Sequence, residues 1–195
     1  MTADLVPLLH RWLLPALWAA WALYWWATSH DVKPTTRREP LLSRAMHLGP
    51  MFLAAALLWA PRMDVLALDA RFVPWAAWQF WAGAALTAAG LAFTVWARRH
   101  LGRNWSAIVT LKQDHELVTS GPYAWVRHPI YTGLLAGFLG CAIALGQWRG
   151  LLAVALFYAA ALRKYRLEER WMRERFGVAY DAYRARVKAL VPWLF

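Results

Sequence analysis

Five apolar stretches, separated by shorter polar segments, constrain this chain more than any other feature. They lie at Leu5–Thr28, Ala45–Ala60, Pro74–Ala97, Ile130–Trp148 and Leu151–Leu162. A helix needs about 20 apolar residues to cross the hydrocarbon core of a bilayer. The first and third stretches meet this length, and the second is marginal. We therefore predict an all-α integral membrane protein with about five transmembrane helices.

The fifth stretch is short, because at 1.5 Å per residue it would form a helix only about 18 Å long. We predict that it forms a hairpin with the fourth through Gly146–Gly150 and then continues out of the membrane as one helix. Apolar and aromatic residues recur at helical spacing as far as Phe176, and Gly177 is a suitable stop. A final amphipathic helix is predicted over Val178–Lys188, lying on the membrane.

The composition agrees with a membrane protein, since 61% of the residues are hydrophobic, against roughly 45–50% in soluble domains. Apolar stretches run through the whole chain, so we predict one bundle without a separate soluble domain. The single cysteine, Cys141, excludes an intrachain disulfide and a CxxC motif. No nucleic-acid-binding motif accompanies the net charge of +11. The expected partner of the basic residues is therefore the lipid bilayer and not nucleic acid.

Lys and Arg are distributed unequally between alternate polar segments. Segments 29–44, 98–129 and 163–195 contain 18 of the 22 basic residues. The other side holds Arg11, Arg62, Arg71 and Arg149. By the positive-inside rule, we predict that the N-terminus is outside and that the loop before the fourth helix and the C-terminal segment are cytoplasmic.

Tryptophan and histidine near the predicted helix ends are interpreted as interfacial residues. The first stretch opens with Asp4 and is rich in tryptophan, so a retained helix is expected there rather than a signal peptide. Anchoring at the membrane surface is predicted for Trp25, Trp26, Trp75, Trp96 and Trp148. Interfacial positions rather than metal ligation are predicted for His10, His30, His47 and His100. No metal is expected, because no cluster has zinc-ligand spacing and HExxH is absent.

The segment Arg98–Tyr131 is the most informative polar region. It is too polar to cross lipid and too long for a simple connection, and its apolar residues indicate an ordered loop. Pro129 restricts the residue before it and favours a helix start near Ile130. Arg127 and His128 would then lie at the cytoplasmic mouth of the fourth helix. For an isolated Arg-His pair, membrane anchoring together with helix capping would be the favoured interpretation over a functional role.

Two adjacent acids, Glu168 and Glu169, lie where the fifth helix is expected to leave the membrane. They could be ordinary surface residues, because Glu169 is placed to pair with Arg173 at helical spacing. The alternative is a functional pair that acts together with Arg127 and His128.

The order of these motifs resembles isoprenylcysteine carboxyl methyltransferases and their phospholipid-methyltransferase relatives. The motifs are Leu117–Tyr123, Val126–Gly133, Glu168-Glu169 and the Phe176–Tyr183 pattern FGxxYxxY, with Pro192 at the end. The resemblance covers about residues 100–195, whereas residues 1–97 match only as membrane helices. It therefore implies two parts of one structural unit: helices one to three in 1–97, and a methyltransferase region in 98–195.

The resemblance implies a pocket for S-adenosylmethionine, with S-adenosylhomocysteine as the product. Family positions that hold this cofactor match His115, Leu117, Val118, Tyr123, His128, Pro129, Tyr131, Glu168 and Glu169. A carboxylate can pair with the cofactor's ammonium group, while aromatic and aliphatic walls can enclose its adenine. A glycine-rich GxGxxG motif is absent from the sequence, so the soluble Rossmann type of methyltransferase is excluded.

The resemblance also implies an acceptor site near the same helix ends. Where the family has a substrate-binding Arg, this chain has Lys164, which lacks the planar fork of arginine. Roles with the acceptor are predicted for Arg127, His128, Arg163, Lys164 and Arg166. A carboxylate acceptor is ionised at neutral pH and needs a cation to orient it but no general base.

Three functions remain open at the sequence level. The first is carboxyl O-methylation of a lipophilic, isoprenylcysteine-like acceptor. The second keeps the cofactor but methylates a phospholipid amine or a small thiol, which requires an acid-base residue such as His128 or Glu169. The third is a non-catalytic membrane scaffold. The two enzymatic hypotheses require the polar loop and the acidic pair to meet in one cavity.

Overall fold

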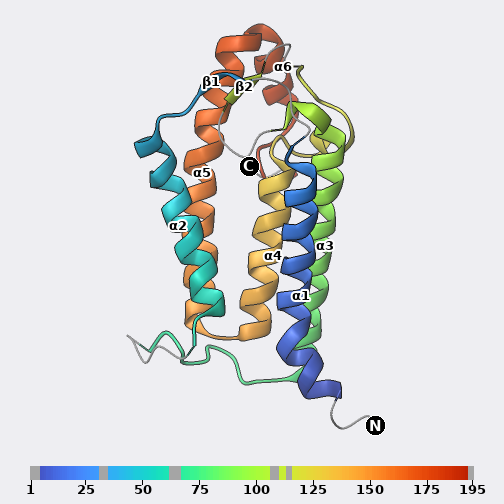
Figure 1. Ribbon diagram of the computed structural model, residues 1–195, viewed down its shortest axis with the longest axis vertical. Helices are drawn as coiled ribbons and strands as arrows, with labels where there is room; N and C mark the ends of the chain where they lie inside the picture. Colours follow the sequence, from blue (N-terminus) through green and yellow to red (C-terminus); the bar gives the residue numbers. More distant parts are fainter. Residues whose placement is uncertain (1–4, 31–34, 62–66, 106–109, 113–115, 193–195) are drawn as a thin grey trace.

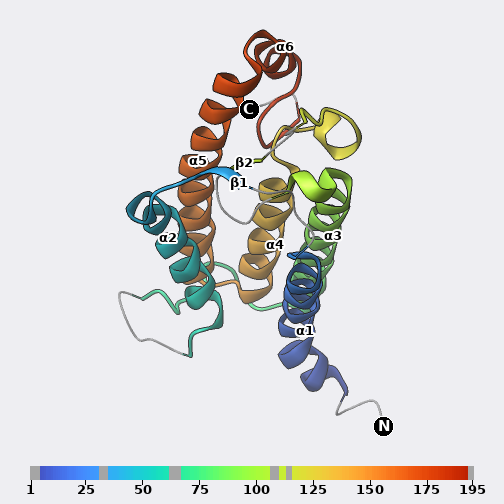
Figure 2. The same cartoon turned by 45° about the horizontal axis from the view of Figure 1, so that its top comes forward.

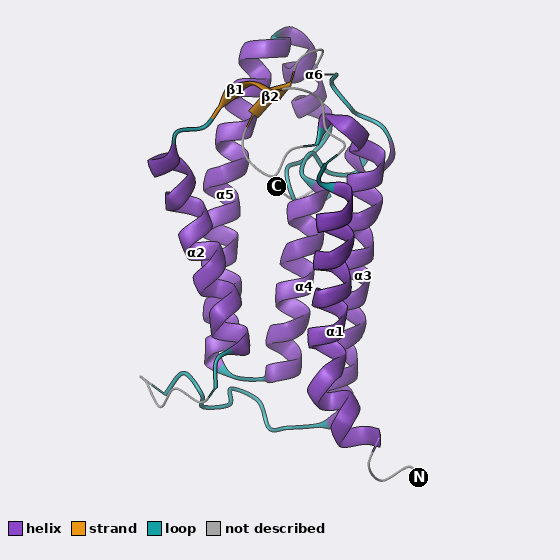
Figure 3. Ribbon diagram, in the orientation of Figure 1, coloured by secondary structure: helices purple, strands orange, loops and turns teal. Residues whose placement is uncertain are grey.

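The computed structural model describes residues 5–30, 35–61, 67–105, 110–112 and 116–192, and these are mainly helical (Figure 3). The described α-helices are α1 (Leu5–Thr28), α2 (Leu41–Trp59), α3 (Ala77–Leu101), α4 (Pro129–Leu145), α5 (Trp148–Phe176) and α6 (Val178–Arg186). Short 3-10 turns lie at Gly102–Asn104 and Gly121–Ala124. Two strands, β1 (Thr35–Arg38) and β2 (Thr110–Lys112), form a small antiparallel sheet that the sequence did not predict.

The five long helices run side by side, and α6 and the sheet lie together at one end of the bundle (Figure 1). α3 packs along α4, α2 along α5, and α1 against α3. The start of α1 and the turn between α4 and α5 lie at the opposite end. Among the described helices, α2 and the segment Ala77–Asn104 are long and apolar enough to cross a membrane, while α4 is apolar but has 17 residues.

The hairpin of α4 and α5 forms as predicted but with a shorter turn. α4 ends at Leu145 and is capped by Gly146, whose φ of 64° is in the left-handed region that glycine adopts without a steric penalty. α5 already begins at Trp148, so the predicted turn over Gly146–Gly150 is reduced to two residues. The helix then continues without a break to Phe176 and ends at Gly177, as the sequence predicted.

Small residues bring α3 and α4 into close contact. A Cβ atom added to Gly133 would lie 2.5 Å from the backbone oxygen of Gly90. One added to Gly140 would lie 2.5 Å from the backbone oxygen of Gly83. The backbones of the two antiparallel helices therefore touch at two levels, seven residues apart on each helix, which fixes the position of α4.

Two arginines hold the helix ends together at the end of the bundle opposite α6. Arg149 Nε lies 3.1 Å from Asp69 Oδ1, and its Nη1 donates to the carbonyl of Ala60 at 2.5 Å. Arg71 Nη1 donates to the carbonyl of Leu145 at 3.0 Å. These side chains satisfy carbonyls that the helix ends leave without intrahelical partners.

The extended segment Val187–Leu190, which follows α6, lies along the start of α4. The backbone amides of Arg127 and His128 donate to the carbonyls of Lys188 and Ala189 at 2.8 Å and 3.0 Å. α6 therefore ends at Arg186 rather than at the predicted Lys188, because the residues after it pair with the loop before α4.

The small sheet ties the start of α2 to the long loop before α4. In it, Thr35 pairs with Lys112, and Arg38 pairs with Thr110. β1 leads directly into α2, which runs beside α5 (Figure 2). This connection places Glu39 between the sheet and the first turn of α2.

Candidate functional site

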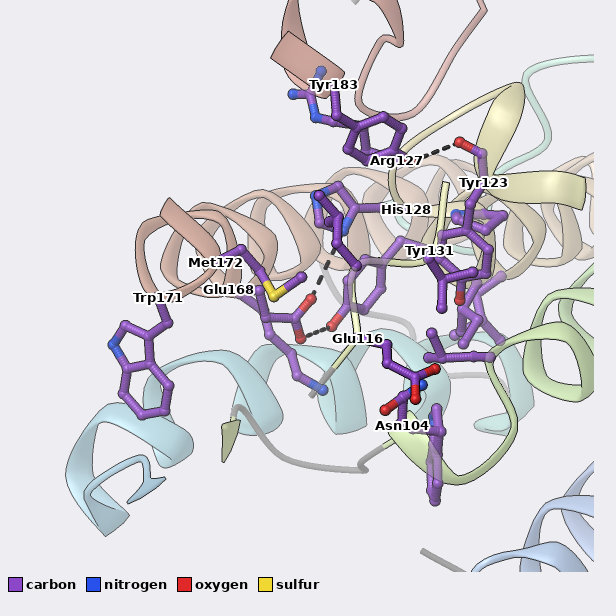
Figure 4. A pocket seen from close by; sticks show the side chains of 18 of the residues that line it. Asn104, Glu116, Tyr123, Arg127, His128, Tyr131, Glu168, Trp171, Met172 and Tyr183 are labelled. Carbon is purple, nitrogen blue, oxygen red and sulfur yellow. Dashed lines mark hydrogen bonds and ion pairs between the residues drawn. The ribbon is translucent and has the colours of Figure 1, made fainter. Parts of the chain in front are cut away.

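A cavity of about 280 Å³ lies at the end of the bundle that carries α6 (Figure 4). Side chains from α1 to α6 and from the loop before α4 line it. The sequence predicted nine of the lining residues: Leu117, Val118, Tyr123, Arg127, His128, Pro129, Tyr131, Lys164 and Glu168. The polar loop and the acidic stretch of α5 therefore do meet at one end of the molecule.

Four predicted site residues are not among those that line this cavity. Glu169 is buried behind it, in contact with Arg127 and His128. Arg163 points towards α2, where its Nη1 donates to the carbonyl of Ser43 at 2.9 Å. Arg166 is exposed on α5. His115 lies outside the described residues.

Glu169 joins α5 to the loop before α4. Its Oε1 accepts from Arg127 Nη2 at 2.7 Å and from His128 Nε2 at 3.0 Å, and Arg184 Nε lies 3.4 Å from Oε2. Burial alone would raise the pKa of this carboxyl, but His128 and then Arg127 outweigh it and lower the pKa to about 2. The surface pairing considered for Glu169 with Arg173 is replaced by these buried contacts, and Arg173 pairs with Asp181 instead.

Glu168 is the carboxylate of the pair that faces the cavity. Tyr131 donates its hydroxyl to Glu168 Oε1 at 2.6 Å, and His128 Nδ1 lies 3.7 Å from Oε2 (Figure 4). The Glu168 side chain keeps 27% of its surface exposed, against 9% for Glu169. Since its contacts leave part of the carboxylate open to the cavity, Glu168 can accept further hydrogen bonds from a bound cation.

His128 connects the two glutamates. Its ring nitrogens lie against Glu168 and Glu169, and its ring stacks on Tyr165 of α5 with centroids 4.8 Å apart. A carboxylate only accepts, so Nε2 carries the hydrogen that bonds to Glu169. Residues of α5 thus fix the orientation of the His128 ring: the two glutamates at its edge and Tyr165 at its face.

The tyrosines of the site are held in place by the loop and α6. Tyr183 of α6 donates its hydroxyl to the backbone carbonyl of Tyr123 at 2.6 Å. His100 stacks on the Tyr123 ring with centroids 6.4 Å apart and contacts Ser120 Oγ at 2.9 Å. Burial, and then the nearby Glu168, raise the pKa of Tyr123, so this side chain is a neutral wall of the cavity.

One aromatic wall of the cavity comes from α1 and Trp105 and was not predicted. Trp21 and Trp25 of α1 stack with ring centroids 4.7 Å apart, and Trp25 meets Trp105 edge-on at 5.7 Å. Trp21 Nε1 donates to Thr94 Oγ1 at 2.7 Å, which satisfies its polar edge inside the bundle. Trp25, which was predicted to act only as an interfacial anchor, lines the cavity.

The sequence analysis did not identify the other residues that line the cavity. They are Trp21, Met51, Leu101, Asn104, Trp105, Glu116, Ile130, Leu134, Trp171, Met172, Tyr180 and Tyr183. Apolar residues dominate this set, and an apolar run does not reveal which of its members face a cavity. The tyrosines at 180 and 183 belong to a recognised motif and could have been included.

The position predicted for His47 also differs from the one observed. It was expected at the membrane interface, but it is fully buried between α2 and α5, where its Nδ1 lies 3.2 Å from Arg163 Nη1. Glu39 lies 3.6 Å from the same nitrogen. Among the described residues, no group of three or more His, Cys, Asp or Glu side chains is arranged to hold a metal ion.

Comparison with known proteins agrees with the motif order. Residues 78–179 match the model of the phospholipid methyltransferase family, which is just over half of the chain. A protein-S-isoprenylcysteine O-methyltransferase of Schizosaccharomyces pombe is 36% identical over 94 residues, covering 47% of this chain and 40% of that protein. Methanethiol S-methyltransferase 1 of Bradyrhizobium diazoefficiens is 36% identical over 76 residues, covering 36% of this chain and 24% of that protein.

A solved structure has a similar arrangement of helices. It is the eukaryotic intramembrane Ras methyltransferase ICMT, isoprenylcysteine carboxyl methyltransferase, with a TM-score of 0.51 and 25% identity. The match covers 78% of this chain and 51% of that chain. This chain thus spans about half, or less, of the length of these relatives. The sequence resemblance to the isoprenylcysteine enzymes is confirmed, and the chain belongs to the phospholipid methyltransferase family.

Proposed function

We propose that this protein transfers a methyl group from S-adenosylmethionine to a lipophilic acceptor, with carboxyl O-methylation of an isoprenylcysteine-like molecule as the leading reaction. The observation that carries the proposal is Glu168, a partly open carboxylate in a cavity whose other walls are largely aromatic and aliphatic. Family membership and the relatives named as methyltransferases support the reaction class.

The residues that line the cavity fit this cofactor. Glu168 is placed to bind an ammonium group; Tyr131 hydrogen-bonds one of its oxygens, and His128 Nδ1 lies 3.7 Å from the other. Leu117 and Val118 offer apolar surface and Tyr123 a flat ring, which are the kinds of contact that enclose adenine. We assign cofactor contacts to these residues and to Pro129, and His115 stays in the proposal from the motif match alone. When bound, S-adenosylmethionine supplies an electrophilic methyl group on a sulfonium sulfur.

The protein's own contribution is positioning and exclusion of water. The buried Arg127–Glu169 pair fixes the loop before α4 against α5, so that His128 and Tyr131 keep their places beside Glu168. The tryptophan wall keeps one side of the cavity dry. A dry site preserves both the electrophilic methyl group and the strength of charge interactions.

Lys164 is proposed to orient the acceptor. It is 8% exposed, lines the cavity, and its Nζ lies 5.6 Å from the centre of the Tyr131 ring. An ammonium group here can hold an acceptor carboxylate, which needs no general base. Arg163 and Arg166 do not line the cavity, so an indirect role is proposed for Arg163 and none in acceptor binding for Arg166.

We further propose that all five long helices cross the membrane, with the N-terminus outside and the site at the cytoplasmic face. Large apolar side chains on the outer faces support lipid contact, as Leu42 is 78% exposed, Phe52 72% and Trp78 66%. On the proposed outer side, Arg149 lies 3.1 Å from Asp69, an ion pair that offsets one of the few basic charges on that face. A lipophilic acceptor would then enter from the bilayer.

Calorimetric titration of the detergent-solubilised protein with S-adenosylhomocysteine tests the proposal directly. We expect one binding site per chain, with affinity lost in Glu168→Gln. A folded protein that binds neither S-adenosylhomocysteine nor S-adenosylmethionine would refute it.

A second reaction is favoured by the relative named methanethiol S-methyltransferase and by the name of the family itself. A thiol or amine acceptor must lose a proton, and His128 is the cavity residue suited to accept it. Radiolabelled methyl transfer into membrane extracts separates the two cases. A methyl ester releases labelled methanol after mild base treatment, whereas an S-methyl or N-methyl product keeps the label.

A further inference from the structure

A second cavity, of about 180 Å³, lies towards the end of the bundle opposite α6 (Figure 1). Residues of α1, α2, α3 and α4 line it, and all of them are apolar except Arg11. The proposed reaction takes place in the first cavity, at the α6 end of the bundle, and leaves this second cavity without a role.

The two cavities lie along the same faces of three helices. On each of these helices, a residue that lines the first cavity is followed, seven positions nearer the opposite end, by one that lines the second. The pairs are Trp21 and Leu14 on α1, Met51 and Leu58 on α2, and Leu134 and Cys141 on α4. Seven residues make about two helical turns, or about 10 Å along the axis. The cavities are therefore two sections of one apolar seam between α1, α2 and α4.

Trp18 of α1 separates the two sections. It lines neither cavity but contacts a lining residue of each. Its ring meets that of Trp21 edge-on with centroids 5.7 Å apart, and its Nε1 donates to Cys141 Sγ at 3.2 Å. A Cβ atom added to Gly137 would lie 3.2 Å from the Trp18 ring. The indole thus lies against the α4 backbone and fills the seam between the cavities.

Two phenylalanines complete this barrier. Trp18 meets Phe138 of α4 edge-on at 5.5 Å, and Phe138 stacks on Phe157 of α5 at 4.4 Å. Both phenylalanines are buried. From α2, the fully buried Ala54 belongs to the same core cluster and leaves room for the rings. The barrier is therefore held by α1, α4 and α5, and the hydrogen bond to Cys141 fixes the indole in it.

The polarity of the first cavity gives an acceptor one orientation. The proposed function, on which this inference rests, places the anionic group of the acceptor at Lys164. The remaining charged groups, such as Arg127 and Glu168, lie on the loop before α4 and on the same part of α5. The membrane helices contribute apolar side chains, on which a hydrocarbon chain is favourably buried. The chain of a bound acceptor therefore points along the seam towards Trp18.

We propose that Trp18 is a specificity-determining residue, which ends the part of the site that binds the hydrocarbon chain and so sets the longest chain that is buried in full. A longer chain has to bend out of the seam or displace an indole that is hydrogen-bonded and packed on both sides. Removal of the indole joins the two cavities and lengthens the seam by about 10 Å.

The test is methyl transfer to three acceptors that differ only in chain length: N-acetyl-S-geranylcysteine, N-acetyl-S-farnesylcysteine and N-acetyl-S-geranylgeranylcysteine. In Trp18→Ala we expect the ratio of KM for the longest acceptor to KM for the shortest to fall about tenfold or more, in line with the effect of a few methylene groups in an apolar pocket. kcat should change little, because the barrier is remote from Glu168. Trp26→Ala, which removes an exposed tryptophan from the same helix, is the matched control and should leave the ratio unchanged.

A second variant covers the case in which Trp18→Ala does not fold. Trp18→Leu keeps an apolar contact with Phe138 and shortens the barrier less, so we expect a smaller change of the KM ratio in the same direction. Calorimetry with S-adenosylhomocysteine shows for each variant whether the cofactor end is intact. An unchanged KM ratio in a Trp18 variant that still binds S-adenosylhomocysteine would overturn the inference.

A second measurement needs neither cofactor nor methyl transfer. Prenylcysteines with a diazirine at the end of the chain are cross-linked to the full-length protein, and the labelled residues are identified by mass spectrometry. We expect the farnesyl probe to label Trp18 or Phe138 in the wild-type protein, and the geranylgeranyl probe to label Leu14 or Leu58 in Trp18→Ala. Labelling confined to exposed side chains such as Phe52 would contradict the proposed path. Failure of the wild-type protein to bind S-adenosylhomocysteine would instead overturn the proposed function and leave the cross-linking result standing.

Discussion

Glu168 and Glu169 are neighbours in sequence, yet the structure assigns them different consequences when each is replaced by glutamine. Glu169 is buried in a bond network with Arg127, His128 and Arg184, and it does not line the cavity. We predict that Glu169→Gln chiefly destabilises the protein, while Glu168→Gln chiefly removes cofactor binding.

The size of the first effect can be worked out from the ionisation of Glu169. Its pKa falls from the model-compound value of 4.5 to about 2 in the folded protein. At about 1.36 kcal/mol per unit, this corresponds to roughly 3 kcal/mol of stability at neutral pH. Breaking a buried ion pair by removing one partner costs about 3–5 kcal/mol, which agrees. For a chain of this size, the midpoint of thermal unfolding should fall by about 6–12 °C.

The pH dependence gives this prediction a second test. Because the folded-state pKa is lower than the unfolded value, the contribution of Glu169 is complete above about pH 4.5 and is lost as the pH falls towards 2. The wild-type protein should therefore lose stability over this range, and Glu169→Gln should lose less. Tryptophan fluorescence during heating of the detergent-solubilised protein measures both quantities.

Glu168→Gln is the matched comparison. It exchanges the charged acceptor of the Tyr131 hydroxyl for a neutral amide oxygen, a difference of about 1 kcal/mol, so its unfolding temperature should change little. Its affinity for S-adenosylhomocysteine should fall at least about tenfold. If Glu169→Gln kept the wild-type unfolding temperature and lost cofactor binding, the assignment of the two glutamates would be reversed.

Three further predictions follow from contacts described above. Gly140→Ala places a Cβ 2.5 Å from a backbone oxygen of α3 and should cost about 1–3 kcal/mol, whereas Gly49→Ala, with open space around it, should not lower the unfolding temperature. Tyr183→Phe removes the hydrogen bond to the Tyr123 carbonyl and should weaken S-adenosylhomocysteine binding about threefold to tenfold, measured by calorimetry. Trp25→Ala should raise KM for a lipophilic acceptor at unchanged cofactor affinity; equal loss of both would place this side chain at the cofactor instead.

The bundle itself could be predicted because its signals are local. Long apolar stretches, Pro129 at a helix start and Gly177 at a helix end each determine their surroundings within a few residues. The same applies to the continuation of α5 from the hairpin to Phe176. These features depend on backbone conformation and burial, which the sequence encodes directly.

The parts that could not be predicted depend on contacts between distant segments. The strands at 35–38 and 110–112 are short and polar, without the alternation that marks a half-buried strand. Trp25 and Trp26 are equivalent in sequence, yet Trp25 faces the cavity and Trp26 is 67% exposed. The rotation of α1 about its own axis decides which of the two tryptophans faces the cavity. That rotation is set by packing against α3.

Burial of Glu39 and His47 was missed for a related reason. His47 was expected near a helix end, where contact with water is the usual outcome, and nothing in the sequence singled out Glu39. Their partner, Arg163, is more than 100 residues further along the chain. No local pattern could indicate that α2 and α5 would bury these groups against each other.

The extended segment after α6 has a consequence for how the protein is made. Thr132, in the first turn of α4, donates to the carbonyl of Leu190, a residue translated 58 positions later. The loop that carries Arg127 and His128 therefore stays without its backbone partners until the ribosome has released nearly all of the described chain. Helices α1 to α5 can form one after another during synthesis, but the end of the bundle that carries the proposed site can assemble only after Leu190 has been made, so the proposed activity has to wait for that residue.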